Sequence, residues 1–328
     1  MTDTAISVRG LRKSYGGTAA VDGIDLQVAR GEVFSLLGPN GAGKTTTVEI
    51  LEGYRRRDAG EVSVLGVDPR EAGADWRARI GIVLQSTGEF EELKVSEVVR
   101  HFAAYYPAPD DADAVIERVG LAEKRDARAK TLSGGQRRRL DVALSIIGRP
   151  ELLFLDEPTT GFDPQARRDF WDVVRRLAQA GTTILLTTHY LHEAESLADR
   201  VAVIDHGRIV DLGTPATLGG RDKQPAVVRW DGGEVRTDTP TKVVADLAAT
   251  YDGAEIPGLS VTRPTLEDIY LSMIAAESQP RDAAEAGDRP VSADNPEPAE
   301  NSEPANQSQP TDRSGTTDPQ AQLKDGAV

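Results

Sequence analysis

The fold is decided by one stretch of the sequence, Gly38-Pro39-Asn40-Gly41-Ala42-Gly43-Lys44-Thr45. It has the form G-x-x-x-x-G-K-[ST], in which glycines let backbone amides turn inward around phosphate groups. The apolar run Val33–Leu37 precedes it and predicts a strand, while Thr46–Leu51 follows it and predicts a helix. Because a helix N-terminus after such a loop attracts anions, the stretch predicts a binding site for nucleotide phosphates.

Two side chains of this loop carry specific chemistry. Lys44 supplies a mobile positive charge for phosphate oxygens, and Thr45 offers a hydroxyl to Mg²⁺. A chance match to the motif somewhere in a chain of this length has odds of roughly one in a hundred. The motif alone leaves kinases, GTPases and ATPases open as classes.

An apolar strand that ends in two carboxylates follows further along the chain. Leu152–Leu155 is the strand-length run, and Asp156 and Glu157 come directly after it. Taken alone, paired acids after a strand are most often a solvated turn, but the phosphate loop upstream favours a catalytic interpretation. Asp156 suits the coordination shell of Mg²⁺, and Glu157 is placed to orient or deprotonate an attacking water.

The pentapeptide Leu132-Ser133-Gly134-Gly135-Gln136 opens another helical pattern. Ser133 and Gln136 have the spacing of a capping box. Two glycines at a helix start are each unfavourable by about 1 kcal/mol relative to alanine, which is tolerable where backbone amides approach a phosphate closely. The chain thus has two anion-binding helix starts, and one triphosphate satisfies both only between two chains or in a domain folded back on itself.

These motifs, in this order, resemble the ATP-binding cassette (ABC) ATPase family over about residues 5–215; the matching segments are Pro39–Thr46, Leu132–Gln136 and Leu153–Pro158. The resemblance implies that two cassettes pack head to tail, with each ATP between Lys44 of one subunit and Ser133 and Gly135 of the other. With one cassette in the chain, we expect a homodimer that ATP closes and hydrolysis reopens.

The resemblance also assigns further positions. Gln85 matches the glutamine that senses Mg²⁺ and the transporter interface, and His189 matches a histidine that contacts the γ-phosphate. Tyr15 matches the aromatic that stacks on adenine, although packing is the common role of such a residue. Asp163 lies in a loop where Phe162 replaces the more usual leucine. The implied site comprises catalytic residues Glu157, His189 and Gln85; ATP contacts Tyr15, Gly38, Pro39, Asn40, Gly41, Ala42, Gly43, Lys44, Thr45, Thr46, Ser133, Gly134, Gly135, Gln136 and Asp163; and metal ligands Thr45, Gln85 and Asp156.

Short apolar runs alternate with helical patterns from residue 5 to about 213, which predicts an α/β domain with a largely parallel sheet. A helical pattern at Val95–Gly120 predicts an inserted helical subdomain, at about residues 86–148. With the resemblance, we expect a P-loop NTPase fold, specifically an ABC-type nucleotide-binding domain at residues 1–220.

The remainder of the chain differs in character. Val227–Trp230 and Glu234–Arg236 flank a turn sequence and predict a hairpin, and Thr265–Asp268 predicts a helix start, so residues 221–276 form a small α+β accessory domain. Residues 277–328 contain no aromatic side chain and are rich in Pro, Glu, Asp and Ser. We expect a disordered acidic tail, because such a segment buries too little apolar area to offset its ordering entropy.

Composition limits the partners. The formal charge of −15 argues against a basic nucleic-acid interface, and Arg137–Arg139 is interpreted as a solvated helix face. There is no cysteine, and no apolar run approaches the ~20 residues that cross a bilayer. We expect a cytoplasmic protein, peripheral on the inner face of the cell membrane, that reaches the membrane only through a separate transmembrane permease subunit.

Two segments, Ala198–Val210 and Arg263–Tyr270, are similar to ATPases of drug and antibiotic exporters of the daunorubicin-resistance type. The resemblance implies an ATP-hydrolysing subunit that powers export of drug, antibiotic or lipid-like compounds. Two alternatives remain: an ATPase switch acting on a non-transport partner, and an ATP-binding module that does not hydrolyse. Glu157 and His189 argue against the second alternative.

Overall fold

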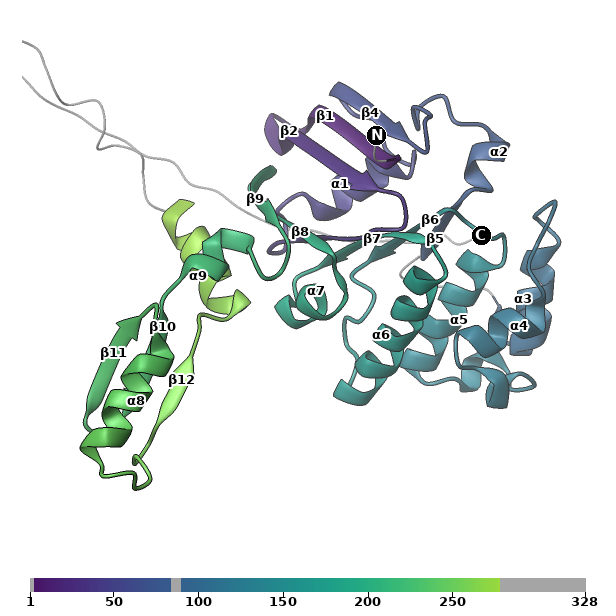
Figure 1. Ribbon diagram of the computed structural model, residues 1–328. Coiled ribbons are helices and arrows are strands. Elements are labelled where there is room, and N and C mark those ends of the chain that lie inside the picture. The colour runs from purple at the N-terminus through teal and green to yellow at the C-terminus, as the bar shows by residue number, and fades with distance from the viewer. Residues whose placement is uncertain (1–2, 84–89, 278–328) are drawn as a thin grey trace, which may run out of the picture. The chain divides into compact units, whose positions relative to one another are not determined.

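A parallel-rich sheet forms the centre of the fold in the computed structural model, which describes residues 3–83 and 90–277 (Figure 1). Six strands pair in the order β5-β6-β7-β3-β8-β9. Neighbouring strands from β5 to β8 run parallel, and β9 is antiparallel to β8. The α/β class predicted from the sequence is confirmed. The strands are β3 (Val33–Leu37), β5 (Ile80–Val83), β6 (Leu152–Asp156), β7 (Thr183–Thr188), β8 (Arg200–Asp205) and β9 (Arg208–Gly213).

Three further strands form a separate antiparallel sheet, in the order β2-β1-β4. They are β1 (Thr4–Tyr15), β2 (Thr18–Ala29) and β4 (Ala59–Val64). Helix α1 (Lys44–Leu51) lies between this sheet and the central one, and its Val48 and Leu51 are buried in the core shared by both sheets (Figure 1). The loop before α1 is therefore supported from two sides.

Central strands bury both of their faces, as expected of a parallel sheet covered by other elements on each side. Phe34, Leu36 and Phe154 point into the core shared with α1 and the antiparallel sheet. Leu153 and Leu155 point into a second core, which α5 (Gly134–Ile146) and α6 (Pro164–Gln179) cover (Figure 1). Because side chains on both faces of these strands are buried, the strand ends that carry the polar residues are held in place.

The helical pattern at residues 95–120 is two helices rather than one. Helix α3 (Val95–Ala103) ends before Pro107 and Pro109, because proline disfavours a continuing helix. Asp111 then caps α4 (Ala112–Arg118) by accepting a hydrogen bond from the amide of Ala114 at 2.9 Å. Two 3₁₀ turns, η2 (Ala122–Lys124) and η3 (Ala129–Thr131), lead to α5, and α3, α4 and α5 contact one another.

A second α+β region follows the central sheet. Its strands pair in the order β11-β10-β12, and the hairpin predicted around residues 231–233 joins β10 to β11. The sequence analysis did not identify α8 or β12. The elements not yet given are α2 (Ala74–Arg77), α7 (Leu191–Leu197), η4 (Leu218–Lys223), β10 (Ala226–Trp230), β11 (Gly233–Thr237), α8 (Pro240–Thr250), β12 (Ser260–Thr262) and α9 (Leu266–Glu277).

Helix α9 docks on the central sheet through its first turn. Thr265 and Asp268 exchange hydrogen bonds as the predicted capping box, with the amide of Asp268 donating to Thr265 Oγ1 at 3.1 Å. Leu266 is 1% exposed and packs with Leu37, Val203 and Leu218. Leu37 is the last residue of β3, so α9 supports the strand that leads into the phosphate loop.

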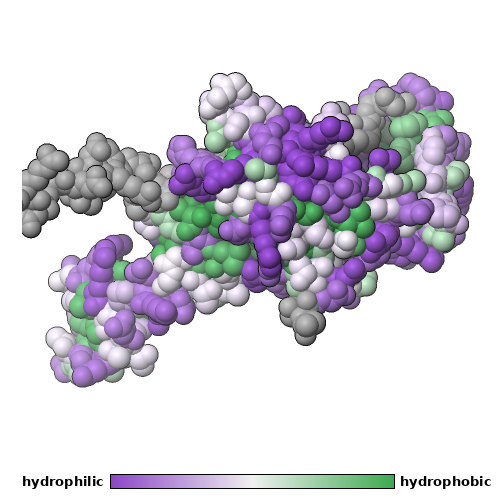
Figure 2. Space-filling model, turned by 90° about the horizontal axis from the view of Figure 1, so that it is seen from above, coloured by the Kyte–Doolittle hydropathy of each residue, from purple (hydrophilic) through white to green (hydrophobic). Residues whose placement is uncertain are grey.

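Among residues 3–83 and 90–277, no helix has both the length and the apolar content to span a membrane. Figure 2 shows one face of the molecule, on which hydrophilic side chains predominate and apolar ones gather in small areas. Gln85 and residues 278–328 of the predicted tail lie outside the described residues.

Leu266→Ala is expected to lower the free energy of unfolding by about 3 kcal/mol, because the truncation leaves a cavity where α9 meets the sheet. Leu271→Ala on the same helix, where the side chain is 58% exposed, is the control and is expected to have little effect. Urea unfolding monitored by circular dichroism measures both. Equal losses in the two variants would contradict the docking of α9 through Leu266.

Candidate functional site: a phosphate loop at the ends of parallel strands

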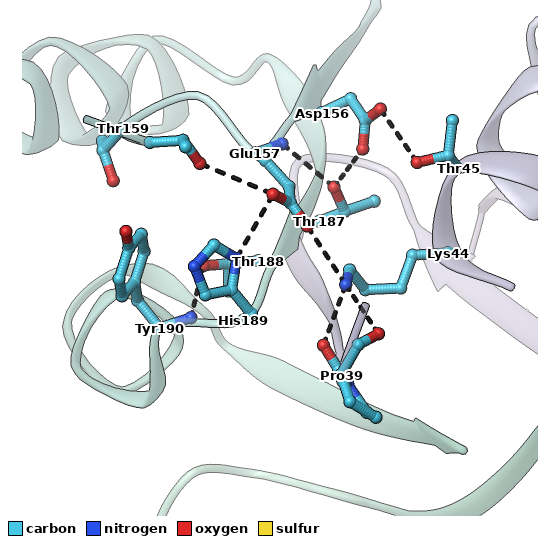
Figure 3. A network of polar contacts seen from close by, with 12 residues as sticks. Pro39, Lys44, Thr45, Asp156, Glu157, Thr159, Thr187, Thr188, His189 and Tyr190 are labelled. Atoms are coloured by element: carbon cyan, nitrogen blue, oxygen red, sulfur yellow. Dashed lines mark hydrogen bonds and ion pairs between the residues drawn. The ribbon is translucent and has the colours of Figure 1, made fainter. Parts of the chain in front are cut away.

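The loop between β3 and α1 encloses the amine of Lys44, which is 4% exposed. Lys44 Nζ donates to the carbonyl oxygens of Gly38 at 2.8 Å and Pro39 at 3.1 Å. It also lies 3.1 Å from Glu157 Oε1, as Figure 3 shows. A buried ammonium needs such partners, because its desolvation without them is strongly unfavourable.

Close backbone approach explains two of the loop glycines. A Cβ on Gly43, whose φ is 103°, would lie 2.3 Å from the carbonyl oxygen of Ala20. A Cβ on Gly38 would lie 2.2 Å from the carbonyl oxygen of Ile204. The loop is thus pressed against its neighbours, and only glycine fits at either position.

The other loop residues differ in exposure. Ala42 is buried, and its carbonyl accepts a hydrogen bond from the amide of Gly207 at 3.0 Å. Pro39 and Thr46 are partly buried, whereas Asn40, Gly41 and Thr45 are exposed.

Asp156 ends β6 beside the phosphate loop. Its Oδ2 accepts a hydrogen bond from Thr45 Oγ1 at 3.2 Å, and its Oδ1 accepts one from Thr187 Oγ1. The pairing of β6 with β7 sets Asp156 opposite Thr187, so the parallel register brings these groups to one edge of the sheet. A carboxylate and a hydroxyl 3.2 Å apart are the donor set that Mg²⁺ takes from proteins when phosphate supplies other ligands.

The electrostatics beside Asp156 also fit a cation. Burial, followed by the charges of Asp156 and Glu49, raises the pKa of Glu52 to about 8. Burial is the main cause of this shift, and the neighbouring carboxylates of Asp156 and Glu49 add to it. Among the described residues no group of three His, Cys, Asp or Glu side chains forms a metal site, and Mg²⁺ at a nucleotide needs none.

Glu157 has an unusual backbone conformation for a residue with a side chain, with φ at 43°. Its amide donates to both oxygens of Thr187, at 3.1 Å to the carbonyl and 3.0 Å to Oγ1. Figure 3 shows Lys44 and His189 pointing toward its carboxylate. Burial raises the pKa of Glu157, but the hydrogen bond and charge of Lys44, aided by His189, outweigh it and hold the pKa below its usual value.

His189 follows β7 and faces the same carboxylate. Its Nδ1 lies 3.2 Å from Glu157 Oε2 but at an angle outside hydrogen-bond geometry, and Nδ1 has no other hydrogen bond among the described residues. The ring stacks at a tilt on Tyr190, with 4.0 Å between centroids. The histidine nitrogen is thus held close to the site while its hydrogen-bonding capacity is still available.

The glycine-rich start of α5 has the predicted capping box. The amide of Ser133 donates to Gln136 Oε1 at 3.1 Å, and the amide of Gln136 donates to Ser133 Oγ at 3.3 Å. A Cβ on Gly135 would lie 2.9 Å from Ala166 Cβ, whereas one on Gly134 would meet nothing within 4 Å. Packing within this chain therefore explains Gly135 but not Gly134.

Two other predicted positions have clear structural surroundings. Asp163 is the N-cap of α6, accepting hydrogen bonds from the amides of Gln165 and Ala166, each at 2.9 Å. Tyr15 is 42% exposed, with the positive groups of Lys13 and Arg55 each 5.4 Å from its ring centre. Its exposure argues against a role in core packing.

A cavity of ≈ 470 Å³ lies between the start of α5 and the end of β6. Gly134 and Glu157 both line it, together with Arg138, Asp141 and Phe162. The structure corrects the interpretation of Arg137–Arg139 as a solvated face, because Arg138 is only 8% exposed. The sequence analysis also missed Thr187, although its place at the end of a strand next to β6 indicated it.

The parallel sheet, the phosphate loop and the carboxylates at the strand ends together define a P-loop nucleotide-binding protein. A model of the ABC transporter family matches residues 21–160. A daunorubicin resistance ATP-binding protein of Streptomyces coeruleorubidus is 40% identical, over 87% of this chain and 100% of the relative. A Nod factor export ATP-binding protein of Ralstonia nicotianae is 38% identical, over 83% of this chain and 94% of the relative.

Solved structures agree. An ATP-binding cassette of an ABC transporter in its ADP conformation matches with a TM-score of 0.59 and 25% identity, over 65% of this chain and 92% of that one. CbiO1 of Clostridium perfringens, part of an ABC transporter complex, matches with a TM-score of 0.60 and 29% identity, over 65% of this chain and 90% of that one. The chain therefore belongs to the ATP-binding proteins of ABC transporters, and its activity is ATP hydrolysis.

The unusual titration of Glu52 predicts a pH dependence of stability in the nucleotide-free protein without Mg²⁺. The pKa of the carboxyl is raised to about 8 in the folded protein, while the unfolded one ionises near the ordinary pKa of 4.5. Between these values the unfolded state binds fewer protons, so stability falls as pH rises. Glu52→Gln is expected to reduce the fall of the thermal unfolding midpoint with rising pH. Glu61→Gln, at an exposed position of β4, is the control and is expected to keep the wild-type fall. Parallel pH profiles for wild type and Glu52→Gln would contradict this.

Proposed function

We propose that this chain powers a membrane exporter, with Glu157 as the base that activates water for attack on the γ-phosphate of ATP. The observation that carries the assignment is the convergence of Lys44 and His189 on the Glu157 carboxylate, at 3.1 and 3.2 Å. A carboxylate held ionised beside a phosphate loop is suited to accept a proton from water as the bond to the leaving ADP breaks.

Phosphate binding would rearrange the Lys44 contacts. In the free protein the amine neutralises Glu157 and bonds to two loop carbonyls. An incoming triphosphate would draw the amine to its β- and γ-oxygens, which leaves the Glu157 carboxylate free to receive the water proton. Thr45 and Asp156 would hold Mg²⁺, and its positive charge would offset the negative charge of the phosphates. His189 would then donate to the γ-phosphate with its available nitrogen.

The remaining contacts follow the loop and the strand edge. The backbone amides of residues 40–46 would surround the phosphates, and exposed Tyr15 would stack on adenine. Asp163 would order the loop before α6, and Gln85, which lies outside the described residues, would complete the Mg²⁺ shell.

We further propose that a second copy of the chain completes each site. The first amides of α5 have no partner within the helix, and the open space at Gly134 allows a phosphate to approach them. In the proposed homodimer, Ser133–Gln136 of one subunit would face the nucleotide of the other. The first amides of α5 would then donate to its phosphates through the open space at Gly134. ATP would then hold the two subunits together until hydrolysis removes the γ-phosphate.

Export follows from the named roles of the relatives, which concern daunorubicin resistance and Nod factor export. We propose that the exported compound is drug-, antibiotic- or lipid-like and that a separate permease subunit forms the path. The ATPase domain at residues 1–220 would act on the inner face of the membrane, with an accessory domain at 221–276 and an acidic tail at 277–328.

Glu157→Gln is expected to leave ATP binding within about two-fold of wild type and to lower kcat by at least ~100-fold, because the amide no longer accepts a proton. Phosphate release and binding of a fluorescent ATP analogue measure the two quantities. Near-normal hydrolysis by the variant would remove Glu157 from the role of base.

Gly134→Ala separates the dimer proposal from a structural role. The added methyl meets nothing within 4 Å in this chain and raises helix propensity, so the variant is expected to be at least as stable as wild type. It is nevertheless expected to weaken ATP-dependent dimerisation, measured by light scattering with non-hydrolysable ATP. Gly135→Ala, which contacts Ala166, is the control that should lose stability as well. Unchanged dimerisation by Gly134→Ala would contradict the proposed interface.

A further inference from the structure

Three consecutive arginines on α5 have different surroundings. Arg137 pairs with Glu91 at 3.2 Å near the surface, and Arg139 donates to the carbonyl of Gly120 at 3.1 Å. Arg137 and Arg138 both line the cavity that also contains Glu157, but only Arg138, between the other two, is buried, at 8% exposed. Burying a guanidinium is unfavourable because the charge loses its hydration, unless hydrogen bonds and opposite charges offset that loss. The burial of Arg138 in the cavity that contains Glu157 therefore requires an explanation.

Arg138 contacts the backbone of the catalytic strand. Its terminal nitrogen Nη2 donates to the carbonyl oxygen of Asp156 at 3.1 Å, and Nη1 lies 4.0 Å from the carboxylate of Asp141. Burial lowers the pKa of Arg138, while the charges of Asp141, Asp156 and Glu193 oppose this effect. The group stays protonated, since arginine does not deprotonate in proteins.

The carbonyl that Arg138 binds belongs to the peptide unit between Asp156 and Glu157. The amide of the same unit donates to both oxygens of Thr187. This peptide is therefore fixed on both edges, by α5 on the carbonyl side and by β7 on the amide side. The next backbone torsion along the chain is φ of Glu157. Its value of 43° is unfavourable for a residue with a side chain and persists only where the surrounding structure holds it.

From this arrangement we propose that Arg138 is a positioning residue, which fixes the Asp156–Glu157 peptide and thereby aims the Glu157 carboxylate. Arg138 lies about one turn after the Ser133–Gln136 capping box on the same helix, so it also ties the orientation of α5 to the base. The inference rests on the proposed role of Glu157.

The test compares conservative variants of the three arginines in the full chain. Arg138→Lys keeps the charge that balances Asp141 but loses the planar fork. It is expected to lower kcat by about ten-fold or more, with KM and the Kd for ATP within about two-fold of wild type. Arg137→Lys and Arg139→Lys are the matched controls and are expected to keep wild-type kcat.

A stability control separates positioning from folding. Thermal unfolding of Arg138→Lys is expected to match that of the two control variants, so that the loss of kcat is not a loss of folded protein. Should Arg138→Lys fail to fold, Arg138→Gln combined with Asp141→Asn removes both charges and is compared with Asp141→Asn alone.

A double variant links the effect to the base. In a Glu157→Gln background, Arg138→Lys is expected to change the residual rate by less than about two-fold, because no carboxylate remains to be aimed. Wild-type kcat in Arg138→Lys, a raised KM at constant kcat, or a full additive loss in the double variant would each overturn the inference. If Glu157→Gln alone stays active, the base assignment fails, and this outcome is distinct from a failure of Arg138→Lys alone.

Discussion

The ion pair between Lys44 and Glu157 is the contact on which the site depends. Lys44 is almost fully buried, and an isolated ammonium there would be strongly destabilised. Two loop carbonyls and the Glu157 carboxylate satisfy it in the free protein. A triphosphate offers the same ammonium more negative charge, so phosphate binding and release of the carboxylate are one event. In the proposed mechanism, the contact would link the binding of ATP to the release of the Glu157 carboxylate, the proposed base.

The fold brings these groups together through parallel register. Leu37 at the end of β3 pairs with Thr188, and Asp156 at the end of β6 pairs with Thr187. Polar groups that follow three different strands therefore meet at one edge of the sheet, where ligands of open α/β sheets bind. The antiparallel sheet and α9 support this edge of the central sheet, since α1 packs between the two sheets and Leu266 of α9 belongs to the same core cluster as Leu37.

Features set by local chemistry could be predicted from the sequence, and features set by packing could not. The phosphate loop, the carboxylates after β6 and the capping box at Ser133 each depend on residue types at fixed spacing. In the separate antiparallel sheet, β1 and β2 form a hairpin across Gly16 and Gly17, which is a turn signal in the sequence, whereas apolar runs do not specify the pairing of β1 with the distant β4. Helix α8 (Pro240–Thr250) was missed, although proline at the first position of a helix is a start signal that the sequence contains.

Arg138 shows why the middle of a charged run could not be interpreted from composition. Three arginines in sequence suggest a solvated face, but consecutive positions on a helix point about 100° apart, so one of them can face the core. A hydrophobic residue there would remove the hydrogen bond that Arg138 donates to the Asp156 carbonyl and the positive charge 4.0 Å from Asp141. Replacing a buried ion pair by well-packed apolar residues is often neutral or stabilising, so net stability is a weak explanation for a buried charge. A charge retained behind the Asp156–Glu157 peptide is therefore better explained by the aim of a carboxylate than by the stability of the core.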